Sequence, residues 1–100
     1  MTILDQIIKD KFIEVAQRKT AKPLPELLEM SDYQRPGNSL VSNLTKKDST
    51  GIIAEFKRRS PSIKAINLHA NVNDVIPGYQ LAGVSGISVL TDQVYFGGAM

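Results

Sequence analysis

The sequence predicts an α/β protein in which helices come first and a strand–loop–helix–strand unit follows. Apolar residues recur every three or four positions along the start of the chain, which is typical of an amphipathic helix. After Gly51 the pattern changes to two short β-type runs, at residues 52–57 and 86–91, on either side of a helical segment. Two strands joined in this way pair in parallel through a right-handed crossover. We therefore expect a helical extension over residues 1–50 and a strand–loop–helix–strand unit over residues 51–100.

The first helix is predicted to be capped by Thr2, because Asp5 follows at the spacing of a capping pair. It is expected to end before Pro23, since a residue that precedes proline avoids the helical conformation. Its apolar positions share one side of the helix and predict a face that packs on other elements. This predicted apolar face consists of Ile3, Leu4, Ile7, Ile8, Phe12, Val15 and Ala16.

Two shorter helices are predicted before the first strand. Pro25 suits the opening of a helical turn through residues 26–29, because the missing N–H of proline is not needed there. Ser39 is a suitable N-cap for a second short helix over residues 40–47. The residues between them have the composition of a loop.

The helix between the two strands is predicted over residues 75–82. Placing its N-cap at Asp74 puts Pro77 in the first turn, where the missing N–H costs least. Gly83 is the expected stop, because glycine adopts the conformation that ends helices. Residues 93–98, after the second strand, are expected to form a loop.

Composition limits the possible functions. The chain carries 12 Lys and Arg against 10 Asp and Glu, a net charge of +2 that argues against a general polyanion binder. It has no Cys and one His, which excludes disulfides, thiolate metal sites and multi-His metal sites. No apolar stretch approaches the roughly 20 residues that span a bilayer, and the start resembles no signal or transit peptide. We expect a cytoplasmic protein without a metal or an organic cofactor.

Alternation along the first strand gives the sharpest functional hypothesis. Glu55 and Lys57 are two residues apart and therefore share a face, whereas Phe56 lies on the opposite, apolar face. Ligands of parallel α/β folds gather at the carboxyl ends of the strands, where this charged pair is placed. The same spacing fits a salt bridge at the end of a strand equally well. The pair is thus a candidate for catalysis or for simple charge pairing.

The basic run Lys57-Arg58-Arg59 precedes Ser60-Pro61 and admits another interpretation. Such runs occur in nucleic-acid-binding patches and at phosphorylation sites. They are more often solvated surface, and the small net charge disfavours nucleic acid as a partner. His69 and the Gly97-Gly98 pair are weaker candidates, for a surface histidine and a phosphate-binding loop respectively.

Four segments of the chain stand out together: IIAEFKRRSPS at positions 52–62, Tyr79 to Gly83, SVLTD at 88–92 and YFGG at 95–98. In this order and at this spacing they resemble the indole-3-glycerol phosphate synthase family. The resemblance extends over nearly the whole chain, and two motifs in order at this spacing are far more specific than either alone.

The resemblance implies a (β/α)8 TIM barrel enzyme of tryptophan biosynthesis with extra N-terminal helices, here cut after the second strand. The implied reaction is that of a carbon–carbon lyase (a carboxy-lyase), which closes a ring and releases CO2 from a phosphorylated small molecule. Matched motif by motif, Glu55 and Lys57 are the catalytic pair. Ser60, Leu90 and Phe96 are the implied substrate-binding residues, with Leu90 facing the barrel interior beside Ser88.

Two departures from the family pattern bear on this expectation. The family usually has Lys-Gly after Ser-Pro-Ser, whereas Ile63-Lys64-Ala65 follows Ser62 here and removes a glycine from the active-site loop. A barrel of this type needs about 250 residues, so further catalytic and phosphate-binding groups are absent and the chain alone is expected to be inactive. The alternative is a non-catalytic interaction or assembly module that self-associates through an exposed strand edge.

Overall fold

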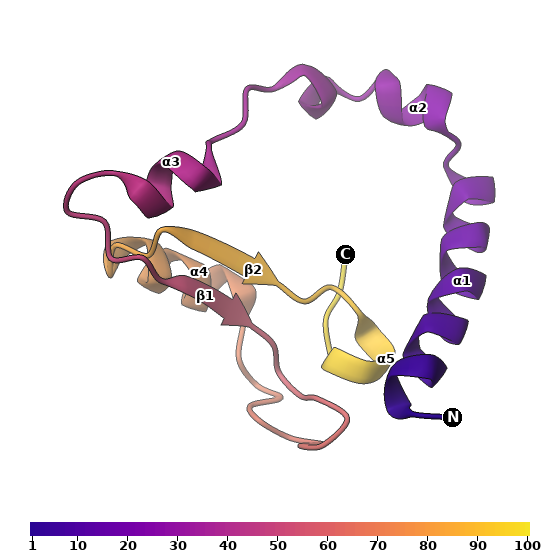
Figure 1. Ribbon diagram of the computed structural model, residues 1–100. Coiled ribbons are helices and arrows are strands. Elements are labelled where there is room, and N and C mark those ends of the chain that lie inside the picture. Colours follow the sequence, from indigo (N-terminus) through magenta and orange to yellow (C-terminus); the bar gives the residue numbers. More distant parts are fainter. The chain divides into compact units, whose positions relative to one another are not determined.

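The computed structural model describes all residues from Met1 to Met100 (Figure 1). The chain divides into two compact units, Met1–Gly37 and Asn38–Met100. The first is entirely helical and the second contains a two-stranded sheet. The sequence analysis placed a boundary after residue 50 instead, between the helical extension and the strand–loop–helix–strand unit. That boundary stays a prediction. In neither unit is there a helix with both the length and the apolar character needed to cross a membrane.

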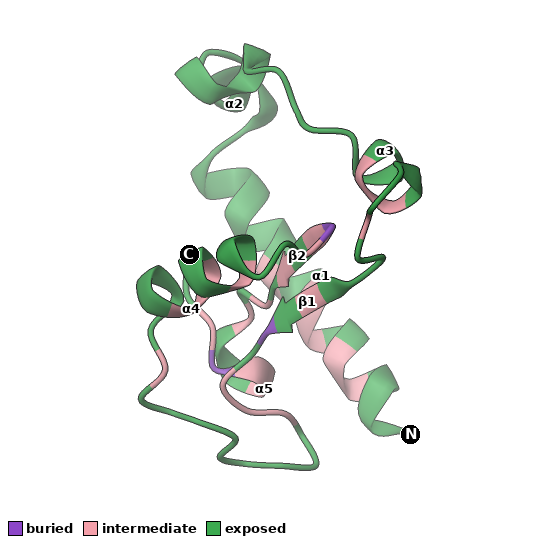
Figure 2. Ribbon diagram, turned by 90° about the vertical axis from the view of Figure 1, so that its left-hand side faces the viewer, coloured by how far each residue is buried: buried purple, intermediate pink, exposed green.

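The first unit begins with α1, Ile3–Ala21, whose predicted cap is confirmed. The Asp5 amide donates to the Thr2 hydroxyl oxygen at 3.2 Å, and the Thr2 amide donates to the Asp5 carboxylate at 2.9 Å. The predicted apolar face is largely solvent-exposed, with Phe12 74% exposed (Figure 2). The two remaining elements are α2, Leu24–Leu28, and a short 3-10 helix, η1, Ser31–Gln34, which the sequence did not predict.

The second unit is built around two parallel strands that pair in register, with Glu55 opposite Ser88. Both strands are shorter than predicted, but the predicted parallel βαβ order is confirmed. Ser39 caps α3 as expected, accepting a hydrogen bond from the Ser42 amide at 3.1 Å. The elements of this unit are α3 (Leu40–Thr45), β1 (Ile53–Phe56), α4 (Val72–Leu81), β2 (Gly86–Val89) and α5 (Gln93–Phe96).

The predicted start of α4 is wrong by three residues. Asn71, not Asp74, is the N-cap, and its side-chain oxygen accepts from the Asn73 amide at 2.8 Å. Pro77 therefore lies inside the helix rather than in its first turn. The carbonyl of Asn73 loses its usual helical donor to this proline, but Asn73 is exposed and water can satisfy it.

The predicted loop over residues 93–98 is also corrected, because its first part is the short helix α5. Asp92 caps this helix by accepting from the Tyr95 amide at 2.6 Å. Gly97 ends it in the left-handed conformation, with φ of 68°. Gly98 then turns the chain back, and its amide donates to the Asp92 carbonyl at 2.7 Å.

A small core lies between α4 and the sheet. Phe56 is the one large apolar side chain that is buried, at 7% exposed. Tyr79 of α4 reaches β1, where its hydroxyl donates to the Glu55 carbonyl at 3.4 Å. On β2, α3 packs so closely that a Cβ at Gly86 would lie 2.5 Å from a methyl carbon of Leu40. The helices thus fix the relative positions of the two strands.

A cluster of hydroxyl groups joins the segments that lead into the two strands. The hydroxyl of Ser85, which is buried, lies 2.8 Å from that of Ser49 and accepts from the Gly51 amide at 3.2 Å. Thr50 donates to the Gly83 carbonyl at 2.8 Å. These bonds hold the amino-terminal ends of β1 and β2 together, opposite the end where the candidate site lies.

Candidate site at the carboxyl ends of the strands

Glu55 and Lys57 form an ion pair on one face of β1, as strand alternation predicts. The Lys57 ammonium nitrogen lies 3.3 Å from a Glu55 carboxylate oxygen. Both side chains are partly exposed, at 38% for Lys57 and 46% for Glu55, so solvent screens their attraction. The burial of Phe56 between them in sequence confirms that the opposite face is the packed one.

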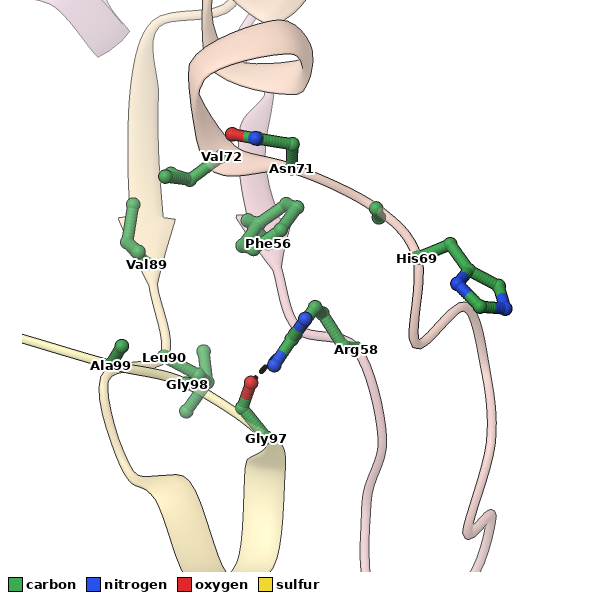
Figure 3. Close-up of a pocket in the computed structure, with 11 residues that line it drawn as sticks. Phe56, Arg58, His69, Asn71, Val72, Val89, Leu90, Gly97, Gly98 and Ala99 are labelled. Carbon is green, nitrogen blue, oxygen red and sulfur yellow. Dashed lines mark hydrogen bonds between the residues drawn. The ribbon is translucent and has the colours of Figure 1, made fainter.

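A cavity lies on that packed side rather than around the ion pair. It has a volume of about 310 Å3 and is bordered by Phe56, Val72 and Val89 (Figure 3). Because Phe56 and Val89 point away from the face that carries Glu55, this cavity lies among the ends of the strands, the start of α4 and the segment that follows α5. It is therefore a separate feature from the charged pair.

Leu90 comes directly after β2 and borders this cavity. Its amide donates to the Phe56 carbonyl at 3.0 Å, so the main chain extends the parallel pairing by one bond. The predicted orientation of the Leu90 side chain toward a barrel interior beside Ser88 stays a prediction. Ser88 itself lies opposite Glu55 in the sheet register and shares its face.

Ser60 lies in the loop that follows β1. Its hydroxyl oxygen accepts from the Ile63 amide at 3.1 Å, and its own amide donates to the Ile63 carbonyl at 2.8 Å. The loop therefore closes into a tight turn at the position where the family pattern is interrupted. A second cavity of about 240 Å3 is bordered by Ser60 together with Val94 and Tyr95 of α5. The loop that carries Ser60 and the helix that carries Phe96 are thus neighbours.

Phe96 is the last residue of α5 and is half-buried. Its carbonyl accepts a hydrogen bond from the Arg58 amide at 3.4 Å. This contact ties the loop after β1 to the helix after β2. The structure therefore brings the main chains of the Ser60 and Phe96 segments together, and the Glu55–Lys57 pair lies on the strand from which the first of these loops departs.

Two arginines that the sequence suggested as a basic patch serve as internal links. Arg58 donates through Nε to the Gly97 carbonyl at 2.7 Å (Figure 3) and through a terminal nitrogen to the Leu68 carbonyl at 3.0 Å. Arg59 donates to the carbonyls of Gln93 and Val94. Their partners are 10 to 39 residues away, so neighbouring sequence carries no signal of this role. A nucleic-acid role for the run stays untested.

No cluster of three or more His, Cys, Asp or Glu side chains is placed to hold a metal ion. The polar groups at the carboxyl ends of the strands are instead a carboxylate, an ammonium and hydroxyls. Such groups can donate or accept protons and hold an anionic substrate. The fold and the site together define a parallel α/β protein with its candidate chemistry at the carboxyl ends of the strands.

Comparison with known proteins identifies the family to which this chain belongs. The family model described as indole-3-glycerol phosphate synthase matches residues 4–100. A protein of this name from Bacteroides thetaiotaomicron is 42% identical over 98 residues, which cover 98% of this chain and 37% of the relative. Another, from Bacillus mycoides, is 39% identical over 99 residues, covering 98% and 35% respectively. The chain thus belongs to the indole-3-glycerol phosphate synthase family and spans a little over a third of the length of these curated relatives.

Proposed function

We propose that this chain supplies the first two strands and the N-terminal helices of a (β/α)8 barrel that acts as an indole-3-glycerol phosphate synthase in tryptophan biosynthesis. The observation that carries the proposal is the Glu55–Lys57 pair at the carboxyl end of β1, in a chain that matches the family from residue 4 to residue 100. The active sites of such barrels lie at that end of the strands. The parent protein would be a carboxy-lyase of the cytoplasm.

The proposed reaction converts 1-(2-carboxyphenylamino)-1-deoxyribulose 5-phosphate to indole-3-glycerol phosphate, CO2 and water. The ring carbon that bears the carboxylate forms a bond to the ketone carbon, and the ketone oxygen takes a proton. Loss of CO2 returns the electron pair to the aromatic ring. A second proton carries the hydroxyl away as water, and the carbon next to nitrogen releases one proton as the indole forms. Two protons are taken up and one is released. The one proton consumed balances the negative charge of the carboxylate, which leaves as neutral CO2.

Lys57 is the residue suited to this chemistry, because an ammonium can donate a proton to the ketone oxygen or hold the departing carboxylate. Glu55, at 3.3 Å, can orient that ammonium or relay protons. Ser60, in the loop after β1, and Phe96, at the end of the neighbouring α5, are proposed to contact the substrate, with Phe96 against its aromatic end. Leu90 is proposed to line the site from the end of β2. No metal or organic cofactor is part of this scheme.

The test joins this chain to the part of the Bacteroides thetaiotaomicron relative that it does not match and measures indole-3-glycerol phosphate formation. We expect the joined protein to be active and the Lys57→Ala form to lose at least about a hundredfold in kcat, the typical contribution of general acid–base catalysis. Lys47→Ala, an exposed lysine after α3, is the matched control. A folded but inactive joined protein, or unchanged turnover in Lys57→Ala, would contradict the proposal.

One structural observation favours a second candidate, an assembly module. The sheet has only two strands, so each strand leaves one edge without a hydrogen-bonded neighbour. Open edges of this kind pair readily with other strands. The mass of the chain in solution distinguishes the two ideas, because self-association through the edge predicts a dimer or larger species whose proportion rises with concentration.

A further inference from the structure

We propose that Arg59 is a positioning residue that holds α5, and with it Phe96, against the loop that follows β1. This proposal rests on the proposed function for its consequence in catalysis, but its structural part stands on contacts alone. Arg59 lies between Lys57 and Ser60, whereas its hydrogen-bond partners lie in α5, more than 30 residues later. One side chain therefore connects the loop that carries Ser60 with the helix that carries Phe96.

The guanidinium of Arg59 meets the carbonyl groups of α5. One terminal nitrogen donates to the carbonyls of Gln93 and Val94, at 2.5 and 2.9 Å. The Gln93 carbonyl already accepts from the Gly97 amide, so Arg59 adds a second donor there and supplies the Val94 carbonyl with a donor from outside the helix. A helix of four residues has almost no internal stability, which makes such external bonds decisive for its position.

The aliphatic part of Arg59 packs on the residue that ends α5. A Cβ at Gly97 would lie 3.2 Å from Cγ and 3.5 Å from Cδ of Arg59, so a larger residue there would require this side chain to shift by a few tenths of an ångström. The Nε atom is buried without a hydrogen-bond partner. Arg59 is thus held to α5 through one terminal nitrogen and through the packing of its side chain on Gly97.

Arg58 reinforces the link but plays a different part. Its amide donates to the Phe96 carbonyl and its Nε to the Gly97 carbonyl, so it contacts the residues at and after the end of α5. It also binds the Leu68 carbonyl and thereby serves the connection to α4. Arg59 contacts only α5 and its terminal glycine among the bonds described here, which makes it the cleaner residue to test.

The first readout is amide hydrogen exchange in the 100-residue chain, which needs no catalytic activity. The Gly97 amide donates to the Gln93 carbonyl at 3.1 Å and reports on the end of α5. The Leu90 amide, bonded to the Phe56 carbonyl, reports on the strand pair and serves as the internal reference. In Arg59→Ala we expect exchange at Gly97 to rise about tenfold relative to Leu90, as for the loss of one hydrogen bond or two. Equal changes at both amides, or none at Gly97, would overturn the proposal.

The second readout uses the joined protein described above. If Arg59 positions Phe96 against the aromatic end of the substrate, Arg59→Ala raises KM about tenfold and leaves kcat within about threefold. Arg59→Lys keeps the charge but lacks the planar fork, so it should recover only part of the loss. Lys47→Ala again serves as the control. Inactivity of the unmutated joined protein counts against the proposed function, and the exchange difference then decides alone whether Arg59 holds α5.

Discussion

Gly98 lies where the chain folds back on the end of β2. A Cβ at this position would lie 2.1 Å from the Leu90 carbonyl oxygen and 2.6 Å from the carbonyl carbon of Thr91. Both atoms belong to the main chain, so neither can move aside as a flexible side chain would. The absence of a side chain at Gly98 is therefore a requirement of the turn after α5.

We expect Gly98→Ala to lower the free energy of unfolding of the second unit by about 1–3 kcal/mol, the usual range for overpacking. Gly78→Ala is the matched control, because a Cβ there meets nothing within 4 Å and lies within α4. Alanine in a helix should raise stability by up to about 1 kcal/mol. Urea denaturation followed by fluorescence or circular dichroism measures both, and equal stability of the two variants would contradict the close approach at Gly98.

At the residue level, the sequence correctly predicted which side chains share a face of β1, because strand alternation determines this. Strand parity placed Glu55 and Lys57 together and Phe56 opposite, because the side-chain period of a strand is fixed by the backbone. The sequence did not predict the contacts of Arg58 and Arg59, which were interpreted as part of a solvated basic run. Their partners are main-chain carbonyls brought near by the crossover between β1 and β2, and no local pattern encodes a main-chain acceptor.

The start of α1 carries a charge that makes its stability depend on pH. Hydrogen bonds from the Thr2 amide and then from the Thr2 hydroxyl to the Asp5 carboxylate hold the pKa of this carboxyl below its ordinary value. The pKa of Glu14 is lowered in the same direction, first by its hydrogen bond from Lys11. Carboxylates with a lowered pKa stabilise the folded form above their unfolded pKa, and this contribution is lost as pH falls through the folded pKa.

We therefore expect the helical content of the chain to fall as pH is lowered from about 5 toward 2, a span that brackets ordinary carboxyl pKa values. Far-UV circular dichroism measures this change. Asp5→Asn should lower the helical signal at neutral pH and reduce its change on acidification. A pH profile of Asp5→Asn that superimposes on that of the unmutated chain would show that the cap does not contribute.

The cap of α4 provides a second test at the level of the element. Asn71 accepts from the Asn73 amide through its side chain, whereas Asn73 contributes only its main-chain N–H. Asn71→Ala should cost about 1 kcal/mol of stability, as for other helix N-caps. Asn73→Ala, a change of the same kind two residues later, should be within about 0.5 kcal/mol of the unmutated chain. Chemical denaturation compares the two, and the reverse order would show that the Asn71 side chain does not cap α4.

The predictions for whole elements failed where two local rules competed. For α4, the penalty for proline inside a helix moved the predicted start to Asp74, but the Asn71 cap and an exposed Asn73 carbonyl reduce that penalty. For α5, two glycines suggested a loop and hid a single helical turn capped by Asp92. Thr2 and Ser39 were predicted correctly as the N-caps of α1 and α3, because no competing signal lay nearby in the sequence.

At the scale of the whole chain, burial is low for a protein of this length. Phe56 is the single buried apolar side chain, while Ile53 on the face of Glu55 is 52% exposed. The open face and edges of the sheet leave the charged pair in water, where electrostatic contributions to catalysis are weak. The reaction proposed above depends on holding both ends of the substrate, and none of the residues proposed for this chain is assigned to the substrate phosphate.

We therefore expect the 100-residue chain alone to form no indole-3-glycerol phosphate above the uncatalysed background. Mixing it with a polypeptide that supplies the remaining strands of the Bacteroides thetaiotaomicron relative should give activity. A discontinuous product assay checks both samples, with the second polypeptide alone as the control. Activity of the isolated chain would refute this expectation.

The hydroxyl cluster and the arginine links have a common consequence for how the second unit forms. Thr50 and Gly83 are 33 residues apart, and Arg58 and Gly97 are 39 apart, so contacts at the two ends of the strand pair close loops of nearly equal length. Closure of one loop brings the ends of the other loop close together. Because doubling the length of a loop adds only about 0.6 kcal/mol to its entropic cost of closure, the second set of contacts forms at little further cost. Both ends of the strand pair should therefore assemble in a single kinetic step. Loss of the hydrogen bonds of the Ser85 hydroxyl should then lower the rate at which the links to Gly97 form and the rate at which the strands pair by the same factor.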